Sequence, residues 1–275
     1  MSTETQPETN EAYHADTTHV SASMLKALHK SPRIYEATYV TGELAFKETP
    51  AMALGTAIHA FALEPKVFDQ EYAVSPFTDK RKKDYKDWAK ANEGKKLLSF
   101  DEAVTLDRCL DSLRSIPVVR TILDAEGLTE ESVRFEDSLS HVKCKCKSDK
   151  VLPEKRLVLD IKTTSELTKR SIEYACEDFG YHIQDAHYRT AWATHTATDV
   201  DDWQMVFAFV ETKPPYRSQA VMLDWDSRSV GMDLRQKLLS EWIVRNESGD
   251  WSQHGEHEIL EVTLPSVYRR RAKGE

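Results

Sequence analysis

The 275-residue sequence lacks any apolar run long enough to cross a membrane. A spanning helix needs about 18 or more consecutive apolar residues. The N-terminal stretch MSTETQPETNEAYHADTT is polar and acidic, without the basic start and apolar centre of a signal peptide. We therefore expect a cytoplasmic protein with no membrane partner, in which residues 1–17 form a flexible acidic tail.

The chain is also poor in cysteine, with four residues in total: Cys109, Cys144, Cys146 and Cys176. So few thiols in a chain of this length do not form a disulfide scaffold, and we expect them to be free. Cys144 and Cys146 could supply half of a zinc site, but no second close pair completes it. The clustered spacing of iron–sulfur ligands is missing as well.

An excess of basic charge is the third feature that the sequence lacks, because its net charge is −9. This excludes a protein that coats nucleic acid through a global positive field, but it leaves room for a local basic groove. Two basic clusters occur, at residues 80–83 and 269–271. Either cluster could be a solvated surface run. Residues 265–275 are expected to form a basic C-terminal tail.

The hydrophobic pattern changes from helical to strand-like near the middle of the chain. We predict helices over 20–29, 32–40, 50–63, 100–113 and 118–124, with an exposed helix or mobile loop over 80–92. We then predict strands over 131–135, 141–151 and 157–163, helices over 165–177 (capped by Thr164 or Ser165) and 181–196, strands over 203–211 and 218–223, and a helix over 227–246. This order indicates an α/β (α+β) fold with a mixed central β-sheet flanked by helices. We expect a single domain, 18–264, with a helical part at 18–125 and a sheet core at 126–264.

The stretch PAMALGTAIHAFAL, residues 50–63, is apolar almost all round. It predicts a buried helix. Gly55 and His59 lie four residues apart and share one face of it.

Charged residues stand at the end of the strand that looks most buried. The apolar run Leu157-Val158-Leu159 is followed by Asp160 and Lys162, and Asp149 lies eleven residues upstream. Strand alternation puts Asp160 and Lys162 on one face, and a hairpin would bring Asp149 to the same sheet edge. Two close carboxylates need a neutralising partner, and oxygen ligands favour Mg²⁺ or Mn²⁺. With a lysine that holds a phosphate or a water, this set suits phosphodiester hydrolysis.

Two alternatives stay open for these residues. Asp160 and Lys162 could form a weak ion pair on a surface hairpin. In a regular strand, Asp149 would also share its face with Lys143, Lys145 and Lys147. Either a bulge precedes Asp149, or the lysines line the approach of a polyanion.

Four pieces of sequence, in this order, resemble the RecB-like branch of the PD-(D/E)xK nuclease superfamily. They are His59 in GTAIH, Asp149 in KCKSDKV, Asp160 and Lys162 in DIKTT, and Gln184 and Tyr188 in QDAHY. The sequence is most similar to nuclease domains of the exodeoxyribonuclease VIII (RecE) type, from about residue 21 to the 220s. The resemblance implies a restriction-endonuclease-like core.

The resemblance also implies roles for individual residues. The metal ligands would be Asp149, Asp160, the Ile161 backbone carbonyl and His59, holding one or two Mg²⁺ ions, with Mn²⁺ able to substitute. Lys162 would position or activate the attacking water, and Gln184 and Tyr188 would face the site and contact DNA or the lysine. Glu131 is a candidate for a further acid. Many relatives carry glutamate where this chain has Asp160.

The activity implied is a Mg²⁺-dependent exonuclease that digests linear double-stranded DNA from 5′ to 3′. The remaining 3′ strand would pass to a single-strand annealing protein (RecT/beta-like) in phage or prophage recombination. Such enzymes form homo-oligomeric rings, here a trimer or a tetramer. Candidate DNA contacts are Lys80, Arg81, Lys82, Lys83, Lys145 and Lys147. A RecB- or Cas4-like nuclease for single-stranded DNA and a non-catalytic DNA-binding module are the alternatives.

Overall fold

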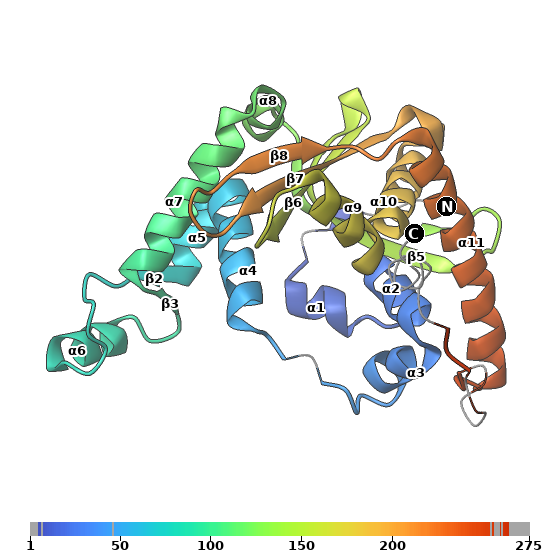
Figure 1. Cartoon of the computed structure of the whole chain (residues 1–275), viewed down its shortest axis with the longest axis horizontal. Helices are drawn as coiled ribbons and strands as arrows, with labels where there is room; N and C mark the ends of the chain where they lie inside the picture. The colour runs from blue at the N-terminus through green and yellow to red at the C-terminus, as the bar shows by residue number, and fades with distance from the viewer. Residues whose placement is uncertain are drawn as a thin grey trace, which may run out of the picture.

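A six-stranded mixed sheet forms the centre of the molecule, with helices on both faces (Figure 1). The computed structural model describes residues 5–6, 8–45, 47–253, 255, 259 and 261–263. The strand order is β1-β4-β5-β6-β7-β8, with bounds β1 Thr5–Gln6, β4 Leu128–Glu136, β5 Lys143–Leu152, β6 Leu157–Thr164, β7 Gln204–Glu211 and β8 Ser218–Val221. Within the described residues of this sheet, β6 and β7 are parallel and the other neighbouring strands are antiparallel. The predicted mixed sheet flanked by helices is confirmed.

Most of the helices precede the central strands in the chain. They are α1 Asn10–Ala15, α2 Ala22–Lys30, α3 Pro32–Tyr35 with a π-helical turn at Glu36–Val40, α4 Pro50–Leu63, α5 Pro65–Glu71, α6 Lys83–Ala91, α7 Phe100–Ser115 and α8 Pro117–Asp124. A small parallel sheet of β2 Tyr72–Val74 and β3 Lys96–Leu98 flanks α6, which stands away from the main sheet (Figure 1). The stretch predicted as an exposed helix or a mobile loop is therefore a helix.

The parallel pair β6–β7 needs a long crossover, which two helices supply. These are α9 Lys169–Asp178 and α10 Tyr181–Thr196, and α11 Trp225–Ser248 follows the sheet. The start predicted for the first of them is four residues too early. Thr164 belongs to β6, whereas Thr168 and Ser171 form a capping box that sets the start of α9.

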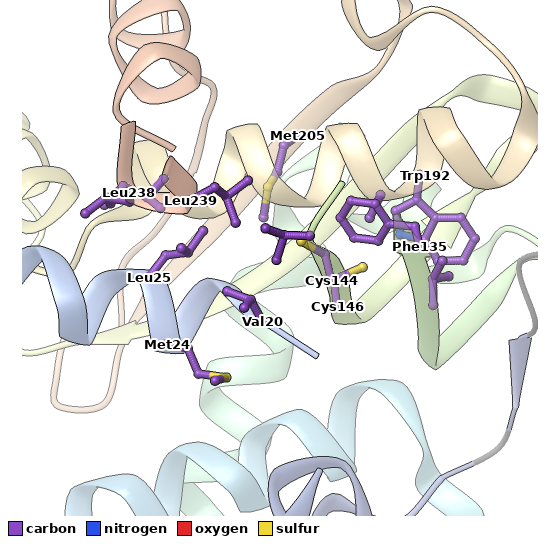
Figure 2. Close-up of a cluster of buried hydrophobic side chains, with 14 of the residues drawn as sticks. Val20, Met24, Leu25, Phe135, Cys144, Cys146, Trp192, Met205, Leu238 and Leu239 are labelled. Atoms are coloured by element: carbon purple, nitrogen blue, oxygen red, sulfur yellow. The ribbon is translucent and has the colours of Figure 1, made fainter. Parts of the chain in front are cut away.

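Two buried clusters lie on opposite sides of the sheet. β7 joins them because its side chains alternate between Met205, Phe207 and Phe209 in one cluster and Val206, Ala208 and Val210 in the other. Figure 2 shows the first cluster, where Val20, Met24 and Leu25 from the N-terminal part meet Cys144 and Cys146 of β5 and Leu238 and Leu239 of α11. A strand buried on both faces reads as a continuous apolar run, as MVFAFV does here.

The N-terminal segment differs from the flexible tail that the sequence suggested. Residues 10–15 form α1, with Tyr13 buried. The Lys145 ammonium donates hydrogen bonds to the carbonyl oxygens of Tyr13 and Asp16, and Arg134 of β4 forms ion pairs with Glu8 and Asp16. Acidic residues that looked solvent-exposed in the sequence are thus paired with basic residues of the sheet.

Helix α4 is less buried than its composition suggested. Only Gly55, Ala57 and Ile58 are buried, because the helix covers the sheet with one face and lines a cavity with another. The basic segment 265–275 lies outside the described residues. Of the helices that the structure describes, none has the length and apolar character that a bilayer crossing demands.

Helices α10 and α11 cross closely at Gly231. A Cβ atom at this position would lie 2.8 Å from the carbonyl carbon of His182 and against its oxygen, closer than a methyl group can approach. We predict that Gly231→Ala lowers the free energy of unfolding by about 1–3 kcal/mol, the usual cost of overpacking. Denaturant unfolding measures the change. Ser229→Ala, at an exposed position of the same helix, should stay within about 0.5 kcal/mol, and equal effects of both changes would contradict the close packing.

Candidate active site

The two carboxylates face one another where β5 and β6 separate. The last paired residues are Lys150 and Leu159, and the same register carries Asp149 across from Asp160. The Ile161 N–H donates a hydrogen bond to Asp149 Oδ2 with an N···O distance of 2.7 Å. Asp160 itself is 3% exposed. The hairpin therefore brings together two acids that are eleven residues apart in the chain.

Helix α4 adds an imidazole to these acids. His59 Nδ1 lies 3.2 Å from Asp149 Oδ2. Gly55, one turn earlier, packs against the end of β6, because a Cβ there would be 3.4 Å from Thr163 Oγ1. This contact sets the distance at which the face of α4 that carries His59 packs on β6.

A third acid comes from β4, and it is Glu130 rather than the candidate Glu131. One donor atom each from His59, Glu130 and Asp149 lie within 4.8 Å of one another. Glu131 pairs with Ser148 in the sheet, and its charge acts on the imidazole of His195 in α10. Glu130 has a left-handed φ of 51°, so the strand departs from regular geometry at the residue that joins the site.

The lysine and the glutamine hold the two oxygens of Asp160. Lys162 Nζ lies 2.5 Å from Asp160 Oδ1, and Gln184 Nε2 donates to Asp160 Oδ2 at 2.5 Å. Tyr188, one turn along α10 from Gln184, lines a cavity together with His59 and Asp149. The structure thus places Gln184 and Tyr188 on the side of α10 that faces these groups.

Two further residues at this place were not anticipated from the sequence. Lys26 of α2 donates to Gln184 Oε1 at 2.8 Å. The ring of Tyr181, at the start of α10, lies 5.3 Å from Lys26 Nζ and 4.9 Å from Lys162 Nζ. No local pattern points to either residue, because α2 and α10 meet only in the folded chain.

Burial and charge act in opposite directions on the ionisable groups. Burial raises the pKa of Asp160, and the charge of Lys162 only partly offsets this. For Asp149, burial is outweighed by the charge and hydrogen bond of His59, so its pKa falls. For Lys162, burial is outweighed by Asp160 and Asp149, so its pKa rises. Two neighbouring carboxyls whose pKa values move apart are typical of functional sites.

A cavity of about 460 Å³ opens beside these residues. Helices α1, α2, α4 and α5 and strands β3, β4 and β5 contribute to its lining, which includes Tyr13, Ser23, Thr56, His59, Glu130, Lys147 and Asp149. The site therefore lies between the sheet and the N-terminal helices.

The candidate DNA-binding lysines occupy different positions. Lys145 is 2% exposed and holds α1 in place, so it is not available to a polyanion, contrary to expectation. Lys147 lines the cavity, where it contacts Asn10 and forms an ion pair with Glu130 at 3.3 Å. The basic residues Lys80, Arg81, Lys82 and Lys83 are exposed and lie at the start of α6.

The alternatives for β5 are resolved by its packing. The pairs Thr129–Lys150 and Glu131–Ser148 flank Asp149, so no residue is inserted there. Yet Cys146 and Val151, an odd number of residues apart, belong to the same buried cluster. The side-chain alternation therefore shifts near Asp149 without an inserted bulge residue, at the point where Glu130 has its left-handed φ.

The donor set fits a hard divalent cation. Carboxylates from Glu130 and Asp149 and one imidazole converge, and Asp160 adds a buried carboxylate across from Asp149. Carboxylate-rich sets suit Mg²⁺ and Mn²⁺, and no cysteine thiolate takes part in the cluster found among the described residues. The His59 proton would have to leave before its nitrogen could bind a metal ion.

The ion pair between His59 and Asp149 predicts a pH effect in metal-free protein. Burial lowers the pKa of His59, but the charge and hydrogen bond of Asp149 outweigh it and raise the pKa to about 9. Because the folded pKa exceeds the unfolded value of about 6.5, the pair stabilises fully below pH 6.5, and this contribution is lost as the pH rises to 9. With EDTA present, we expect the free energy of unfolding of the wild type to fall, relative to His59→Gln, by on the order of 1–3 kcal/mol across this window.

Urea unfolding at closely spaced pH values measures this difference. Lys26 and Glu130 also titrate near pH 7 and are present in both proteins, and because the charge of His59 lowers the pKa of Glu130, part of the difference comes through Glu130. His29→Gln, at an exposed position of α2, serves as the control and should follow the wild type across the window. A constant difference between wild type and His59→Gln would show that the imidazole is neutral in the fold.

Comparisons with known proteins bear on the fold and on the family. The comparison with curated proteins gives no match. A crystal structure described as "Putative exonuclease" from Eubacterium rectale superposes with a TM-score of 0.65 at 13% identity, covering 97% of this chain and 99% of that one, which shows a shared fold. A phage related exonuclease from Haemophilus somnus 129PT matches with a TM-score of 0.33 at 14% identity over 83% and 96% of the two chains, too weakly to carry an argument.

The family comparison covers most of the sequence. Residues 21–260 match the model of the PDDEXK-like domain of unknown function (DUF3799). This match confirms the resemblance to PD-(D/E)xK proteins that His59, Asp149, Asp160, Lys162 and Gln184 suggested. The chain belongs to this PDDEXK-like family.

Proposed function

We propose that the chain is a metal-dependent nuclease that hydrolyses phosphodiester bonds in DNA. The observation that carries this proposal is the convergence of Asp149, Asp160, Lys162 and His59 from three elements, with Asp149 and His59 lining a cavity beside the buried pair Asp160–Lys162. A surface hairpin with a weak ion pair, the simpler alternative, does not account for the burial of Asp160 at 3% exposure. Burying a carboxylate and its lysine partner costs solvation free energy, and such buried ionisable groups are often functional.

The proposed metal ligands are His59 Nδ1, Glu130, Asp149 and Asp160, with the Ile161 carbonyl as a further candidate. One or two Mg²⁺ ions, or Mn²⁺ in their place, would stabilise negative charge on the phosphoryl oxygens and lower the pKa of water. In the reaction, a P–O bond forms from water, one P–O ester bond breaks, the water gives up a proton to solvent, and the leaving oxygen takes up a proton from solvent to form a hydroxyl group. The protein's task is to hold these groups in line.

Lys162 acts as an ammonium rather than as a base. Its raised pKa keeps it protonated at neutral pH, so it can orient the attacking water and stabilise charge on the phosphate. Gln184 holds Asp160 Oδ2 and so limits the rotation of that carboxylate. Tyr188 faces the cavity and is placed to contact the substrate.

For the substrate, we propose linear double-stranded DNA, digested from 5′ to 3′ so that a 3′ single strand remains. The support is the resemblance to RecE-type domains and the exonuclease description of the protein that shares this fold. The 3′ strand would serve a single-strand annealing protein in phage or prophage recombination in the cytoplasm. A homo-oligomeric ring, a trimer or a tetramer, would keep the enzyme on the duplex.

The first test uses a linear duplex labelled separately at each 5′ and 3′ end, with Mg²⁺, Mn²⁺ or EDTA. We expect metal-dependent release from the 5′ end of linear duplex and no attack on circular DNA. Asp160→Asn and Lys162→Met should each lower kcat by at least about 100-fold, as expected for loss of a group that stabilises transition-state charge. A melting temperature close to wild type confirms that each variant is folded.

The outcomes of this test separate the alternatives. Faster digestion of single-stranded than of duplex DNA favours the RecB-like alternative. Tight DNA binding without cleavage under any metal favours a non-catalytic module. Undiminished cleavage by Asp160→Asn would contradict the site assignment.

The basic start of α6 is proposed to contact the DNA backbone. Lys80, Arg81, Lys82 and Lys83 are exposed on a projecting element (Figure 1), and the Tyr85–Trp88 aromatic pair lies on the same helix. Each phosphate contact contributes about 0.9 to the slope of log K against log salt for duplex DNA. We predict that changing all four basic residues to alanine weakens DNA binding and flattens this slope by roughly 2–4.

Fluorescence anisotropy of labelled duplex at 50–200 mM salt measures the slope. The matched control is Lys155→Ala in the exposed β5–β6 turn, which should leave the slope unchanged. An unaltered slope in the fourfold variant would show that these four residues make no phosphate contacts and are an ordinary solvent-exposed basic cluster.

A further inference from the structure

A second lysine beside the site has no role in the function proposed so far. Lys26 lies on α2, and its side chain is half-buried. Its Nζ donates to Gln184 Oε1 at 2.8 Å. Among the described residues it forms no ion pair with a carboxylate within 4 Å, so the amide oxygen is its principal polar partner.

Lys26 is the first member of a chain of contacts that ends at Lys162. Gln184 accepts from Lys26 through Oε1 and donates through Nε2 to Asp160 Oδ2. The other oxygen of Asp160 contacts Lys162. Four polar side chains from α2, α10 and β6 are therefore joined in a row.

The chemistry of the two ends determines the orientation of the amide in the middle. An ammonium group can only donate hydrogen bonds, and an ionised carboxylate can only accept them. The amide of Gln184 satisfies both partners in one orientation only, with its oxygen toward Lys26 and its nitrogen toward Asp160. With Lys26 replaced by an apolar side chain, nothing would oppose a turn that places two oxygens, Oε1 and Oδ2, against one another.

The surroundings of Lys26 are energetically unfavourable for its ammonium form. Burial and, to a smaller extent, the charge of Lys162 lower the pKa of Lys26 to about 7, and the charge of Asp160 opposes this shift. Both ammonium groups lie near the ring of Tyr181, with Lys26 Nζ 5.3 Å and Lys162 Nζ 4.9 Å from its centroid. Burial beside a second lysine destabilises the charged form of Lys26. Such an arrangement is expected at a functional site rather than in a core that serves stability alone.

Gly180 makes room for this lysine. It precedes α10 in a left-handed conformation with φ of 60°, and a Cβ there would lie 3.0 Å from Lys26 Cγ. The connection between α9 and α10 thus leaves space for the stem of Lys26 to reach Gln184.

We propose that Lys26 is a positioning residue of the nuclease reaction, which acts by holding the Gln184 amide so that its nitrogen faces Asp160. This inference rests on the proposed function. In this role Lys26 fixes the orientation of the Asp160 carboxylate through Gln184, and it does not bind DNA.

The experiment is a double-mutant cycle on the full chain with Lys26→Met, Gln184→Met and the combined variant. We expect Lys26→Met to lower kcat on linear duplex DNA about 10-fold, with KM changed less than about twofold. In the Gln184→Met background, the same change should have less than about a twofold effect, because the contact that it acts through is already gone. Lys26→Arg, which keeps a donor, should restore most of the activity.

The matched control is Lys30→Met, an exposed lysine on the same helix, which should behave as wild type. Melting temperatures report the folding of each variant. Additive losses from Lys26→Met and Gln184→Met would overturn the proposal. So would a rise in KM with kcat unchanged, which would make Lys26 a DNA contact.

A second readout separates this inference from the nuclease proposal. Calorimetry with Mn²⁺ alone reports the carboxylate geometry without any turnover. We expect Lys26→Met to weaken Mn²⁺ binding by about 3–10-fold, and to add nothing in the Gln184→Met background. If wild type leaves DNA intact but the Mn²⁺ cycle is coupled, the nuclease function fails and the positioning role stands. If the wild type cleaves DNA but the effects of Lys26→Met and Gln184→Met are additive in both the kcat cycle and the Mn²⁺ cycle, the positioning role alone is overturned. If the wild type neither cleaves DNA nor binds Mn²⁺, the nuclease function and the positioning role are both overturned.

Discussion

The arrangement of the site depends on one constraint, which is the repulsion between two carboxylates that the β5–β6 hairpin sets face to face. Asp149 and Asp160 are both largely removed from water, so each needs compensation from neighbouring groups. Asp149 receives the His59 imidazole and the Ile161 N–H. Asp160 receives Lys162 and, through Gln184, the more distant Lys26. The opposite pKa shifts of the two acids follow from this unequal compensation.

The surrounding fold supplies each compensating group from a different element. β7 is buried on both faces and anchors β6, while α10, packed against the sheet and α11, presents Tyr181, Gln184 and Tyr188. Helix α4 brings His59 to Asp149, and Gly55 on the same face packs against Thr163 at the end of β6. The N-terminal segment, tied down through Lys145, adds one wall of the cavity. Because its side chains come from several elements that pack on one another, the site is held in place by the core of the fold, which is how preorganisation is achieved.

Much of this was accessible from local pattern. The periodicity of residues 181–196 and 50–63 predicts helices with the bounds that the structure has. The alternation around Asp160 and Lys162 predicts their shared face. Predictions failed where a residue's environment is set by distant parts of the chain. The acidic N-terminal stretch resembled a solvated tail because Arg134 and Lys145, its partners, lie more than 100 residues away. Lys145 was predicted to contact DNA for the same reason, because the partners of its ammonium group lie far away in the sequence.

By itself, the sequence predicted most of the helices, the central strands and the mixed sheet, because these depend on periodicity, and strand alternation placed Asp160 and Lys162 on one face. The resemblance to a nuclease family, and no local pattern, added His59 and Gln184 to this set. Only the tertiary structure decided that Glu130 rather than Glu131 joins His59 and Asp149. A single left-handed residue changes which of two adjacent side chains faces the site. The contact between Lys26 and Gln184 was likewise decided by the tertiary structure, since it spans 158 positions in the chain. Such a contact exists only once α2 and α10 have packed on the same sheet.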